Sequence, residues 1–345
     1  MNAILTSGNL PLSIGVGLLA LVVLVLASNE SVKRLVGLAA YFNLSATFMG
    51  MTVVSLSTSI PEIAAHLTGS VGILRGTLDY QIGSAIVLGS NIGSDVVQQT
   101  LIMGLVVFVA GGLYFRRYFL TKSLLPMIGT TVQCIILGWD RVYSRLDGAI
   151  LFGTFVLYTY YLYVDERKHF NKAPGDQEAV QEERKDVPKN RSEATLYALI
   201  ALGTMALTVA SATVTLQIAE FIVQSTSIGG SFIGVITLGV ASALPELTTA
   251  LAGLRNGEHG ICLGTLVGSN ITNPLLGIGL GALTSTYWVP RGLIYWDLPW
   301  ETLTGAFLLV MLWLTKGRLN RWAAVYLVLL YVAYIGFRAV FFMVD

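Results

Sequence analysis

Two related motifs, one in each half of the chain, place a proline and a carboxylate inside apolar sequence. They read Thr58-Ser59-Ile60-Pro61-Glu62 with Gly89-Ser90-Asn91-Ile92, and Ala243-Leu244-Pro245-Glu246 with Gly268-Ser269-Asn270-Ile271. A charged acid at the centre of a bilayer costs about 2.5–3.5 kcal/mol, and proline interrupts helical hydrogen bonding. The duplication of such a costly arrangement predicts a site built jointly by two halves of a membrane protein.

The residue types in these motifs favour binding of a hard cation. Proline donates no backbone hydrogen bond, so we expect carbonyl groups around Ser57–Ser59 and Ser242–Ala243 to be available as ligands. Glu62 and Glu246 add carboxylates, and no lysine or arginine lies near either motif in the apolar sequence. Ca²⁺ takes about six to eight oxygen ligands, whereas Zn²⁺ prefers histidine or cysteine. The motifs therefore predict an all-oxygen cation site.

Hydroxyl and amide groups follow each motif on the next apolar segment. Ser90 and Ser94 are four residues apart and share a helical face, as do Ser269 and Asn273. We expect these faces to add neutral oxygen ligands to the two carboxylates.

The segment that carries Ser90 also contains small residues and a further acid. Gly89 and Gly93 form a small-xxx-small face, which permits close approach of another helix. Asp95 lies about 100° further round this helix than Ser94. It either reaches the same cavity or belongs to a neighbouring polar path.

The composition identifies the solvent in which these elements fold. Of the 345 residues, 54% are hydrophobic and 12% are charged, and the mean hydropathy is +0.70. Soluble domains carry about 25% charged residues, so the sequence predicts an all-α polytopic membrane protein. The two cysteines, Cys134 and Cys262, lie in different halves, which argues against a disulfide framework or a cysteine metal site.

Windows of about 20 residues locate ten apolar spans, five in each half of the chain. The predicted halves are 1–165 and 193–345, joined by a polar linker at 166–192, and the two motif regions are 52–100 and 237–281. We expect the spans near 12–28, 44–68, 81–111, 119–138, 146–164, 195–223, 228–254, 260–284, 298–315 and 322–343.

The distribution of basic residues predicts the orientation in the cell membrane. With the N-terminus outside, most of the 21 lysines and arginines fall on the inside, including those of the linker 166–192. The linker is therefore expected to be cytoplasmic. Because each half has an odd number of spans, the second half enters the membrane inverted relative to the first, as in an inverted-topology repeat.

The paired motifs resemble the two α-repeats of the cation/Ca²⁺ exchanger superfamily, particularly microbial Na⁺/Ca²⁺ exchangers. The resemblance covers the layout of the whole chain, but it is specific only in residues 52–100 and 237–281. It implies a ten-helix antiporter whose second, third, seventh and eighth helices form the ion site, while the long first and sixth helices slide to alternate access. Position by position, it implies ligands at Thr58, Ser59, Glu62, Ser90, Ser242, Glu246 and Ser269.

The chain departs from the family pattern at four positions. Ala243 replaces a ligand serine, Asn273 replaces a family acid, and Ser94 stands where the first repeat has an asparagine. Asp95 is an extra acid, one residue later. We include Ser94, Asp95 and Asn273 among the predicted metal-binding residues, and we expect the differences to alter ion selectivity and stoichiometry.

The function that we expect is secondary active antiport of Ca²⁺, or a similar cation, in exchange for Na⁺. Glu62 and Glu246 would bind either one divalent ion or the competing monovalent ions. No catalytic residues and no cofactor are expected beyond the transported ions. The expected partners are inorganic cations and the lipid bilayer, with no nucleic acid, and the protein is expected to act as a monomer.

Three alternatives remain open at this stage. A proton-coupled cation exchanger would use Asp95 and His66, although the sequence favours an outer-vestibule histidine without a role at His66. The chain lacks the GNxxE element typical of the Ca²⁺/H⁺ branch. A channel is disfavoured because repeated pore rings are absent, and an intramembrane enzyme because the sequence lacks a nucleophile–base set.

Overall fold

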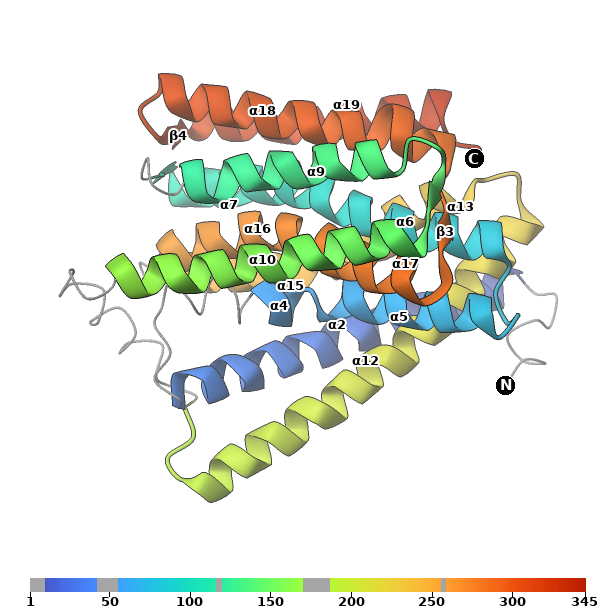
Figure 1. The fold of residues 1–345 in the computed structure, drawn as a ribbon, viewed down its shortest axis with the longest axis horizontal. Helices are drawn as coiled ribbons and strands as arrows, with labels where there is room; N and C mark the ends of the chain where they lie inside the picture. Colours follow the sequence, from blue (N-terminus) through green and yellow to red (C-terminus); the bar gives the residue numbers. More distant parts are fainter. Residues whose placement is uncertain (1–9, 42–54, 116–119, 170–186, 256–258) are drawn as a thin grey trace.

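The computed structural model describes residues 10–41, 55–115, 120–169, 187–255 and 259–345, and these residues are mainly helical (Figure 1). The first half contains α2 (Leu10–Tyr41), α4 (Ser55–Thr58), α5 (Ile60–Leu74), α6 (Tyr80–Val97), η2 (Gln98–Ile102), α7 (Met103–Ala110), β1 (Gly112–Tyr114), η3 (Leu120–Leu124), α9 (Leu125–Leu137), β2 (Val142–Tyr143) and α10 (Arg145–His169). The start of the predicted span 44–68 and most of the linker 166–192 lie outside the described residues.

The second half contains a matching series of elements. They are α12 (Arg191–Ser225), α13 (Gly230–Gly234), η6 (Val235–Gly239), α14 (Val240–Ser242), α15 (Leu244–Arg255), α16 (His259–Thr272), η7 (Asn273–Ile278), α17 (Gly279–Ser285), β3 (Tyr287–Trp288), η8 (Leu293–Asp297), α18 (Leu298–Leu314), β4 (Arg318–Asn320) and α19 (Arg321–Phe341). The η elements are π-helical turns, a widened form of helix that is common at functional sites.

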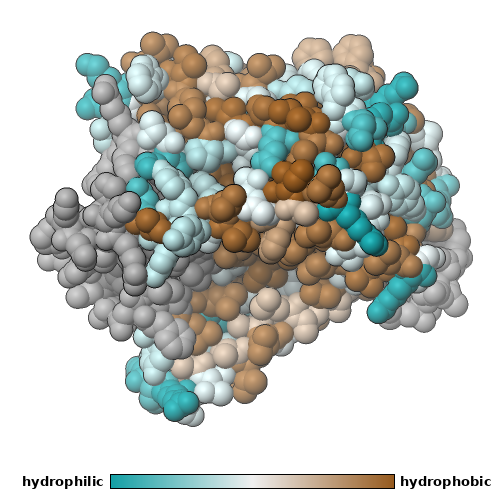
Figure 2. Space-filling model, in the orientation of Figure 1, coloured by the Kyte–Doolittle hydropathy of each residue, from teal (hydrophilic) through white to brown (hydrophobic). Residues whose placement is uncertain are grey.

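Seven helical segments of the described chain are long and apolar enough to cross a membrane. They are Pro11–Leu35, Tyr80–Ala110, Leu120–Leu137, Arg191–Ser225, Gly230–Arg255, Cys262–Ser285 and Arg321–Phe341. Figure 2 shows hydrophobic side chains across the middle of one face, with hydrophilic ones mainly towards its two ends. The predicted class, an all-α polytopic membrane protein, is confirmed, whereas the count of ten spans stays a prediction.

The first helix is longer than its hydropathy indicates. The sequence predicted a span near 12–28, but α2 continues well beyond it. Arg34 and Glu30 form an i, i+4 ion pair at 2.5 Å between Nη2 and Oε1, and the hydroxyls of Ser31 and Thr204 lie 2.7 Å apart. Packing of α2 along α12 therefore extends the helix through polar sequence that hydropathy alone treats as a loop.

Two short antiparallel ladders connect the halves of the chain. β1 pairs with β4, and β2 pairs with β3. In each half, the first strand follows the third predicted span and the second strand follows the fourth. Each first strand thus pairs with the second strand of the other half. A twofold relation between the halves produces this exchange of partners, which supports the predicted repeat.

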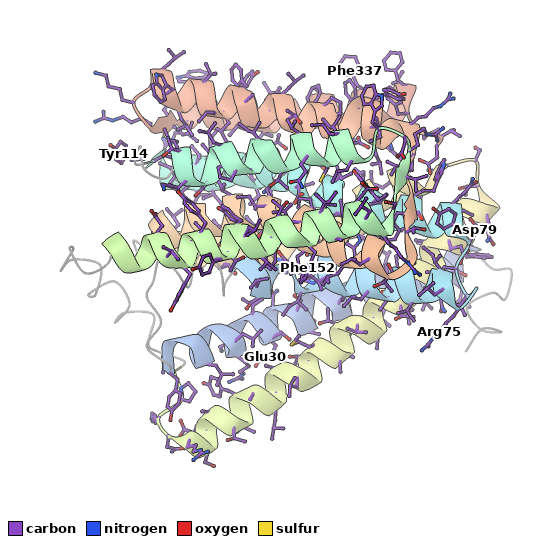
Figure 3. The ribbon with its side chains drawn as sticks, in the orientation of Figure 1. Glu30, Arg75, Asp79, Tyr114, Phe152 and Phe337 are labelled. Carbon is purple, nitrogen blue, oxygen red and sulfur yellow. The ribbon has the colours of Figure 1, made fainter. Side chains whose placement is uncertain are left out.

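The helices exchange partners in the same way. α10 packs against α17, and α19 packs against α7. In Figure 3, Tyr114 of β1 lies at one end of the bundle, whereas Arg75 and Asp79, in the connection between α5 and α6, lie at the other. The helices α9 and α18 each run from one ladder to the other. Both therefore cross the same thickness of the molecule.

A close helix contact joins α6 to the broken helix formed by α13, η6 and α14. A Cβ atom on Gly89 would overlap the carbonyl oxygen of Ser231, and one on Gly93 would lie 2.7 Å from Cα of Val235. From the opposite side, a Cβ on Gly239 would lie 3.0 Å from the carbonyl oxygen of Ser90. The predicted close approach at Gly89 and Gly93 is confirmed, and it brings backbone against backbone.

We expect Gly89→Ala to destabilise the protein, because the added methyl group meets backbone that cannot rotate away. Overpacking of this kind costs about 1–3 kcal/mol and should lower the unfolding temperature of the purified protein. Gly203→Ala in α12 is the matched control, since a Cβ there meets no atom within 4 Å. Equal unfolding temperatures for the two variants would contradict the close contact.

Candidate functional site

Each proline–glutamate motif lies at a break between two helices. Ser59 separates α4 from α5, and Ala243 separates α14 from α15. The two breaks have nearly the same backbone shape, with φ −78° and ψ 4° at Ser59, and φ −80° and ψ −6° at Ala243. The shared sequence motif therefore gives a shared local structure. In both halves the glutamate lies in the first turn of the following helix.

The expectation about backbone carbonyl ligands was wrong at two positions. The amide of Ile63 donates to the carbonyl of Ser59 at 3.0 Å, and the amide of Leu247 donates to the carbonyl of Ala243 at 3.2 Å. Both carbonyls are thus engaged in the helices that follow. Because proline lacks an N–H, the bond that each motif omits is the one to the residue four positions before the proline.

Glu62 is buried, and one of its two carboxylate oxygens is hydrogen-bonded. Its side chain is 1% exposed, and Oε1 accepts a hydrogen bond of 2.7 Å from Oγ of Ser94. The hydroxyl of Ser242, from the other half of the chain, also lies near this carboxylate. The second oxygen, Oε2, has no hydrogen-bond partner within the described residues.

Glu246 has fewer hydrogen-bond partners than Glu62 among the described residues. It is fully buried, and neither of its carboxylate oxygens is hydrogen-bonded to a described residue. The hydroxyls of Thr58 and Ser269 lie near it and are 3.3 Å from each other. The charge of Glu246 interacts with that of Glu62. Each glutamate therefore sits beside a hydroxyl from the opposite half, as expected if the two motifs meet.

Asp95 and Asn273, two of the positions where the sequence was expected to differ from the family, contact each other. Nδ2 of Asn273 donates to Oδ1 of Asp95 at 2.8 Å, and Nδ2 of Asn91 donates to the carbonyl of Asn273 at 3.0 Å. Asp95 also interacts electrostatically with Glu62 and Glu246. The extra acid of the first repeat therefore faces the amide that replaces an acid in the second.

Oxygen atoms without hydrogen-bond partners gather around these residues. Among the described residues they include both carboxylate oxygens of Glu246 and one side-chain oxygen each of Ser59, Glu62, Ser90, Asn91, Asp95, Gln99 and Asn273. A buried polar atom without a partner costs about 1–3 kcal/mol, so such a concentration is expected where an ion binds. An all-oxygen arrangement suits hard cations.

The carboxylates of the described residues are not sufficient by themselves to form a metal site. In the described ranges, no group of three or more His, Cys, Asp or Glu side chains is close enough to hold a metal ion. Hydroxyl and amide oxygens would have to complete any coordination shell. Cys134 and Cys262 are both buried, and they are not bonded to each other.

A further buried acid, Glu301 in the first turn of α18, was not predicted from the sequence. It is 2% exposed, and its Oε1 accepts hydrogen bonds from Oγ1 of Thr131 at 2.7 Å and from Nε2 of Gln99 at 3.3 Å. Nε2 of Gln99 also lies 3.1 Å from Oδ1 of Asn270. A signal was present, since Glu301 follows a proline by two residues inside the apolar span 298–315.

His66 is not an outer-vestibule residue. It is 1% exposed, and its Nδ1 lies 3.2 Å from the hydroxyl of Tyr287, which donates to the carbonyl of His66 at 3.1 Å. The Tyr287 hydroxyl also lies 2.6 Å from Oγ of Ser70. Within the described chain, no hydrogen bond connects His66 to Glu62 or Asp95. Its contacts join α5 to β3.

The fold matches that of a membrane transporter of known structure. The sodium-calcium exchanger NCX_Mj soaked with 10 mM Na⁺ and 10 mM Sr²⁺ superposes with a TM-score of 0.63 and 21% identity, over 95% of this chain and 99% of that chain. A crystal of the same exchanger soaked with 2.5 mM Na⁺ and 0.1 mM Ca²⁺ gives a TM-score of 0.61. These likenesses establish the class, an all-helical polytopic transporter fold.

Comparison of the sequence identifies the family. The "Putative antiporter CaxA" of Alkalimonas amylolytica is 27% identical over 94% of this chain and 97% of its own length. The sodium/calcium exchanger MaX1 of Methanosarcina acetivorans is 24% identical over 92% and 96%. The model of the sodium/calcium exchanger protein family matches residues 12–164 and 195–340, one range in each half. The chain belongs to this family of transporters, and it is not an enzyme.

The contact between Asp95 and Asn273 makes a prediction for variants. In buffer without Na⁺ or Ca²⁺, Asn273→Asp should lower the unfolding temperature, because a second carboxylate replaces the amide that donates to Asp95. The double variant Asp95→Asn/Asn273→Asp restores one donor and one charge, and should recover most of the loss. The coupling between the two sites should be about 0.5–3 kcal/mol. Additive effects of the two substitutions would show that the residues are not in contact.

Proposed function

We propose that the protein is a secondary active antiporter that exchanges Ca²⁺, or a similar cation, for Na⁺. One observation carries the proposal. Glu62 and Glu246 come from different halves, are 1% and 0% exposed, and together leave three carboxylate oxygens without hydrogen-bond partners in the described chain. The names of the related proteins, an antiporter and a sodium/calcium exchanger, support the same type of activity.

We assign the coordinating oxygens to both repeats. Thr58, Ser59, Ser90 and Ser94 of the first half and Ser242 and Ser269 of the second would supply hydroxyl oxygens. Ser94 donates to Glu62, Ser242 lies near Glu62, and Thr58 and Ser269 lie near Glu246. Asp95 and Asn273 lie beside them as a hydrogen-bonded pair. Ca²⁺ needs about six to eight oxygens, so two carboxylates with these hydroxyls are a suitable set.

Charge neutralisation explains exchange without leak. Two ionised carboxylates in a low-dielectric interior repel each other and are poorly solvated. The ion pairs of the described residues involve other acids, namely Glu30, Asp165 and Asp297. A bound Ca²⁺ cancels both charges of Glu62 and Glu246, and Na⁺ ions cancel them when more than one binds. The unloaded pair should therefore resist the change of access.

We propose that access alternates through movement of α2 and α12. The carboxylates are closed to both surfaces in this structure, so an ion needs a conformational change to reach or leave them. The two long helices pack on each other and against α5, and they lie along one edge of the bundle in Figure 1. A movement of this pair can uncover the α5 side of the site without separating the remaining helices.

The proposed orientation of the protein in the membrane follows from the distribution of its lysines and arginines. We propose a place in the cell membrane with the N-terminus outside and the linker 166–192 in the cytoplasm. We also propose that one chain is the functional unit, because the two halves of a single chain supply both glutamates.

Removal of one charge from the glutamate pair should abolish exchange. Glu62→Gln and Glu246→Gln keep a polar side chain of similar size, but one carboxylate alone does not balance a divalent ion. Na⁺-driven ⁴⁵Ca²⁺ uptake into proteoliposomes should fall by at least about tenfold in each variant. Glu220→Gln, the same change on α12 at a partly exposed acid that accepts a hydrogen bond from the amide of Asp79, should transport as the wild type does. Near-normal uptake by either site variant would rule out the assignment.

A proton-coupled exchanger is the second candidate, and the hydrogen bonds of the described residues favour Na⁺ over it. His66 is hydrogen-bonded to Tyr287 and Asp95 to Asn273, and no hydrogen bond of the described residues joins either group to Glu62 or Glu246. We expect ⁴⁵Ca²⁺ uptake to require an opposing Na⁺ gradient and to be absent with a pH gradient in K⁺ buffer. Uptake driven by the pH gradient without Na⁺ would favour the proton-coupled alternative.

A further inference from the structure

We infer that Asp95 and Glu301 form a second cation site, separate from the Glu62–Glu246 pair, that takes a monovalent ion such as Na⁺. The inference rests on the proposed exchange function, because it gives the coupling ion a place of its own. The two acids come from α6 and α18, and both are buried, with exposures of 1% and 2%.

Two neighbouring faces of the helix formed by α6 and η2 contact two different acids, Glu62 and Glu301. Ser94 and Gln98 are four residues apart and share the face directed at Glu62, since Nε2 of Gln98 donates to Oγ of Ser94 at 3.0 Å and Ser94 donates to Glu62. Asp95 and Gln99 are also four residues apart, and they share the next face round the helix. That second face points towards α9 and α18.

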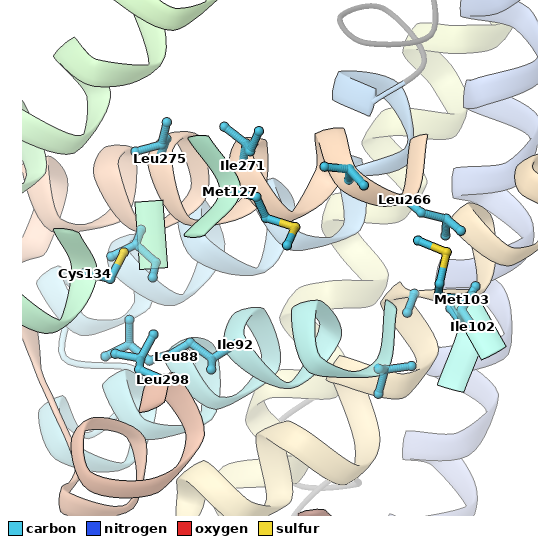
Figure 4. Close-up of a cluster of buried hydrophobic side chains, with 14 of the residues drawn as sticks. Leu88, Ile92, Ile102, Met103, Met127, Cys134, Leu266, Ile271, Leu275 and Leu298 are labelled. Atoms are coloured by element: carbon cyan, nitrogen blue, oxygen red, sulfur yellow. The ribbon is translucent and has the colours of Figure 1, made fainter. Parts of the chain in front are cut away.

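The apolar neighbours of this second face confirm its direction. Leu88 and Ile92 precede Asp95 on the same face, at a spacing of about one helical turn each. Figure 4 draws them in one buried cluster with Leu298 of α18 and with Met127 and Cys134 of α9. Asp95 and Gln99 continue this face beyond the apolar residues. Gln99 therefore reaches Glu301 of α18, an acid that is not hydrogen-bonded to either motif glutamate within the described residues.

Hydrogen bonds join the acids to their surroundings. Gln99 donates to Glu301 at 3.3 Å, Thr131 donates to Glu301 at 2.7 Å, and Asn273 donates to Asp95 at 2.8 Å. Gln99 lies four residues after Asp95 and is hydrogen-bonded to Glu301, so the two acids belong to one buried polar cluster. Their charges interact, and a bound cation would stabilise two buried negative charges there.

Unpartnered oxygens beside the acids point to a ligand. Oδ2 of Asp95, Oε1 of Gln99 and Oδ1 of Asn273 have no hydrogen-bond partner within the described residues, and their side chains are between 0% and 3% exposed. Each of these atoms belongs to a carboxylate or amide whose other polar atom is already bonded within the cluster. The remaining atoms are thus held in place and are free to accept a cation.

The number of free oxygens favours a monovalent ion. Oε1 of Glu301 already accepts two hydrogen bonds and Oδ1 of Asp95 accepts one, so few oxygens remain for a Ca²⁺ shell of about six to eight. The three donors, Thr131, Gln99 and Asn273, stabilise the negative charge that a monovalent ion would leave. Na⁺ is a hard cation that accepts carboxylate and amide oxygens.

A series of hydrogen bonds connects this site with the first. Oε1 of Gln98 accepts from Nδ2 of Asn270 at 3.1 Å, and Oδ1 of Asn270 accepts from Nε2 of Gln99 at 3.1 Å. Through Ser94 at one end and Gln99 at the other, the series runs without a gap from Glu62 to Glu301. A cation that turns the amide of Gln99 therefore changes the hydrogen bonding of the first site.

Equilibrium binding to the purified protein tests the second site without transport. We would measure ²²Na⁺ binding in Ca²⁺-free buffer and ⁴⁵Ca²⁺ binding in Na⁺-free buffer for the wild type, Glu301→Gln, Glu246→Gln and the control Glu220→Gln. Glu301→Gln should lose one class of bound Na⁺ and keep ⁴⁵Ca²⁺ affinity within about threefold of the wild type. Glu246→Gln should lose ⁴⁵Ca²⁺ binding, with affinity lower by at least about tenfold.

The outcomes separate the second site from the proposed function. Unchanged ²²Na⁺ binding in Glu301→Gln would overturn the second site, and equal loss of ²²Na⁺ and ⁴⁵Ca²⁺ would assign Glu301 to the Ca²⁺ site instead. Absence of ⁴⁵Ca²⁺ binding in the wild type would contradict the proposed function alone.

If Glu301→Gln does not fold, Gln99→Met removes one free oxygen and keeps both acids, and it should weaken ²²Na⁺ binding by about tenfold. Wild-type ²²Na⁺ affinity in Gln99→Met would overturn the second site.

Discussion

The structure depends on one constraint, that buried carboxylates lacking a basic partner require a positive charge from outside the protein. Glu62 and Glu246 face each other across the two halves, and among the described ion pairs none includes either of them. The contrast is Asp297, which is equally buried but is paired with Arg338 at 3.1 Å between Oδ1 and Nε. Asp297 is neutralised internally, whereas Glu62 and Glu246 leave three of their four carboxylate oxygens without hydrogen-bond partners among the described residues, as the proposed binding of a cation requires.

Local sequence predicted most of the elements and the centre of the site. Hydropathy located the helices, the proline–glutamate pairs marked the breaks at Ser59 and Ala243, and the glycine spacing on α6 indicated a close contact. These features are encoded within a few consecutive residues. The length of α2, the burial of His66 and the place of Glu301 depend on contacts between distant segments, which a single sequence does not specify. The carbonyl prediction failed because the following helix recruited those groups.

The two repeats have kept their backbone shape while their side chains diverged. The breaks in the two halves agree in φ and ψ to within about ten degrees, yet after the shared Gly-Ser-Asn-Ile the first half continues with Gly93-Ser94-Asp95 and the second with Thr272-Asn273-Pro274. A hydrogen bond between the halves joins Asp95 to Asn273. An aspartate at position 273 would place two carboxylates next to each other, so the amide of Asn273 suits the acid beside it. The scaffold is symmetric, and the charge distribution is not.

The glycine contact between α6 and the broken helix at 230–242 also limits how the molecule can deform. Side chains between two helices can change rotamer as the helices move past each other, but backbone packed directly on backbone has no side chains that can rearrange. We expect this backbone contact to oppose sliding of one helix along the other. Ser90 and Ser94 on one helix and Ser242 on the other therefore keep a fixed spacing in every state in which the contact persists. We therefore expect the spacing of the hydroxyl groups on this wall of the proposed ion site to stay the same for ions of different radius.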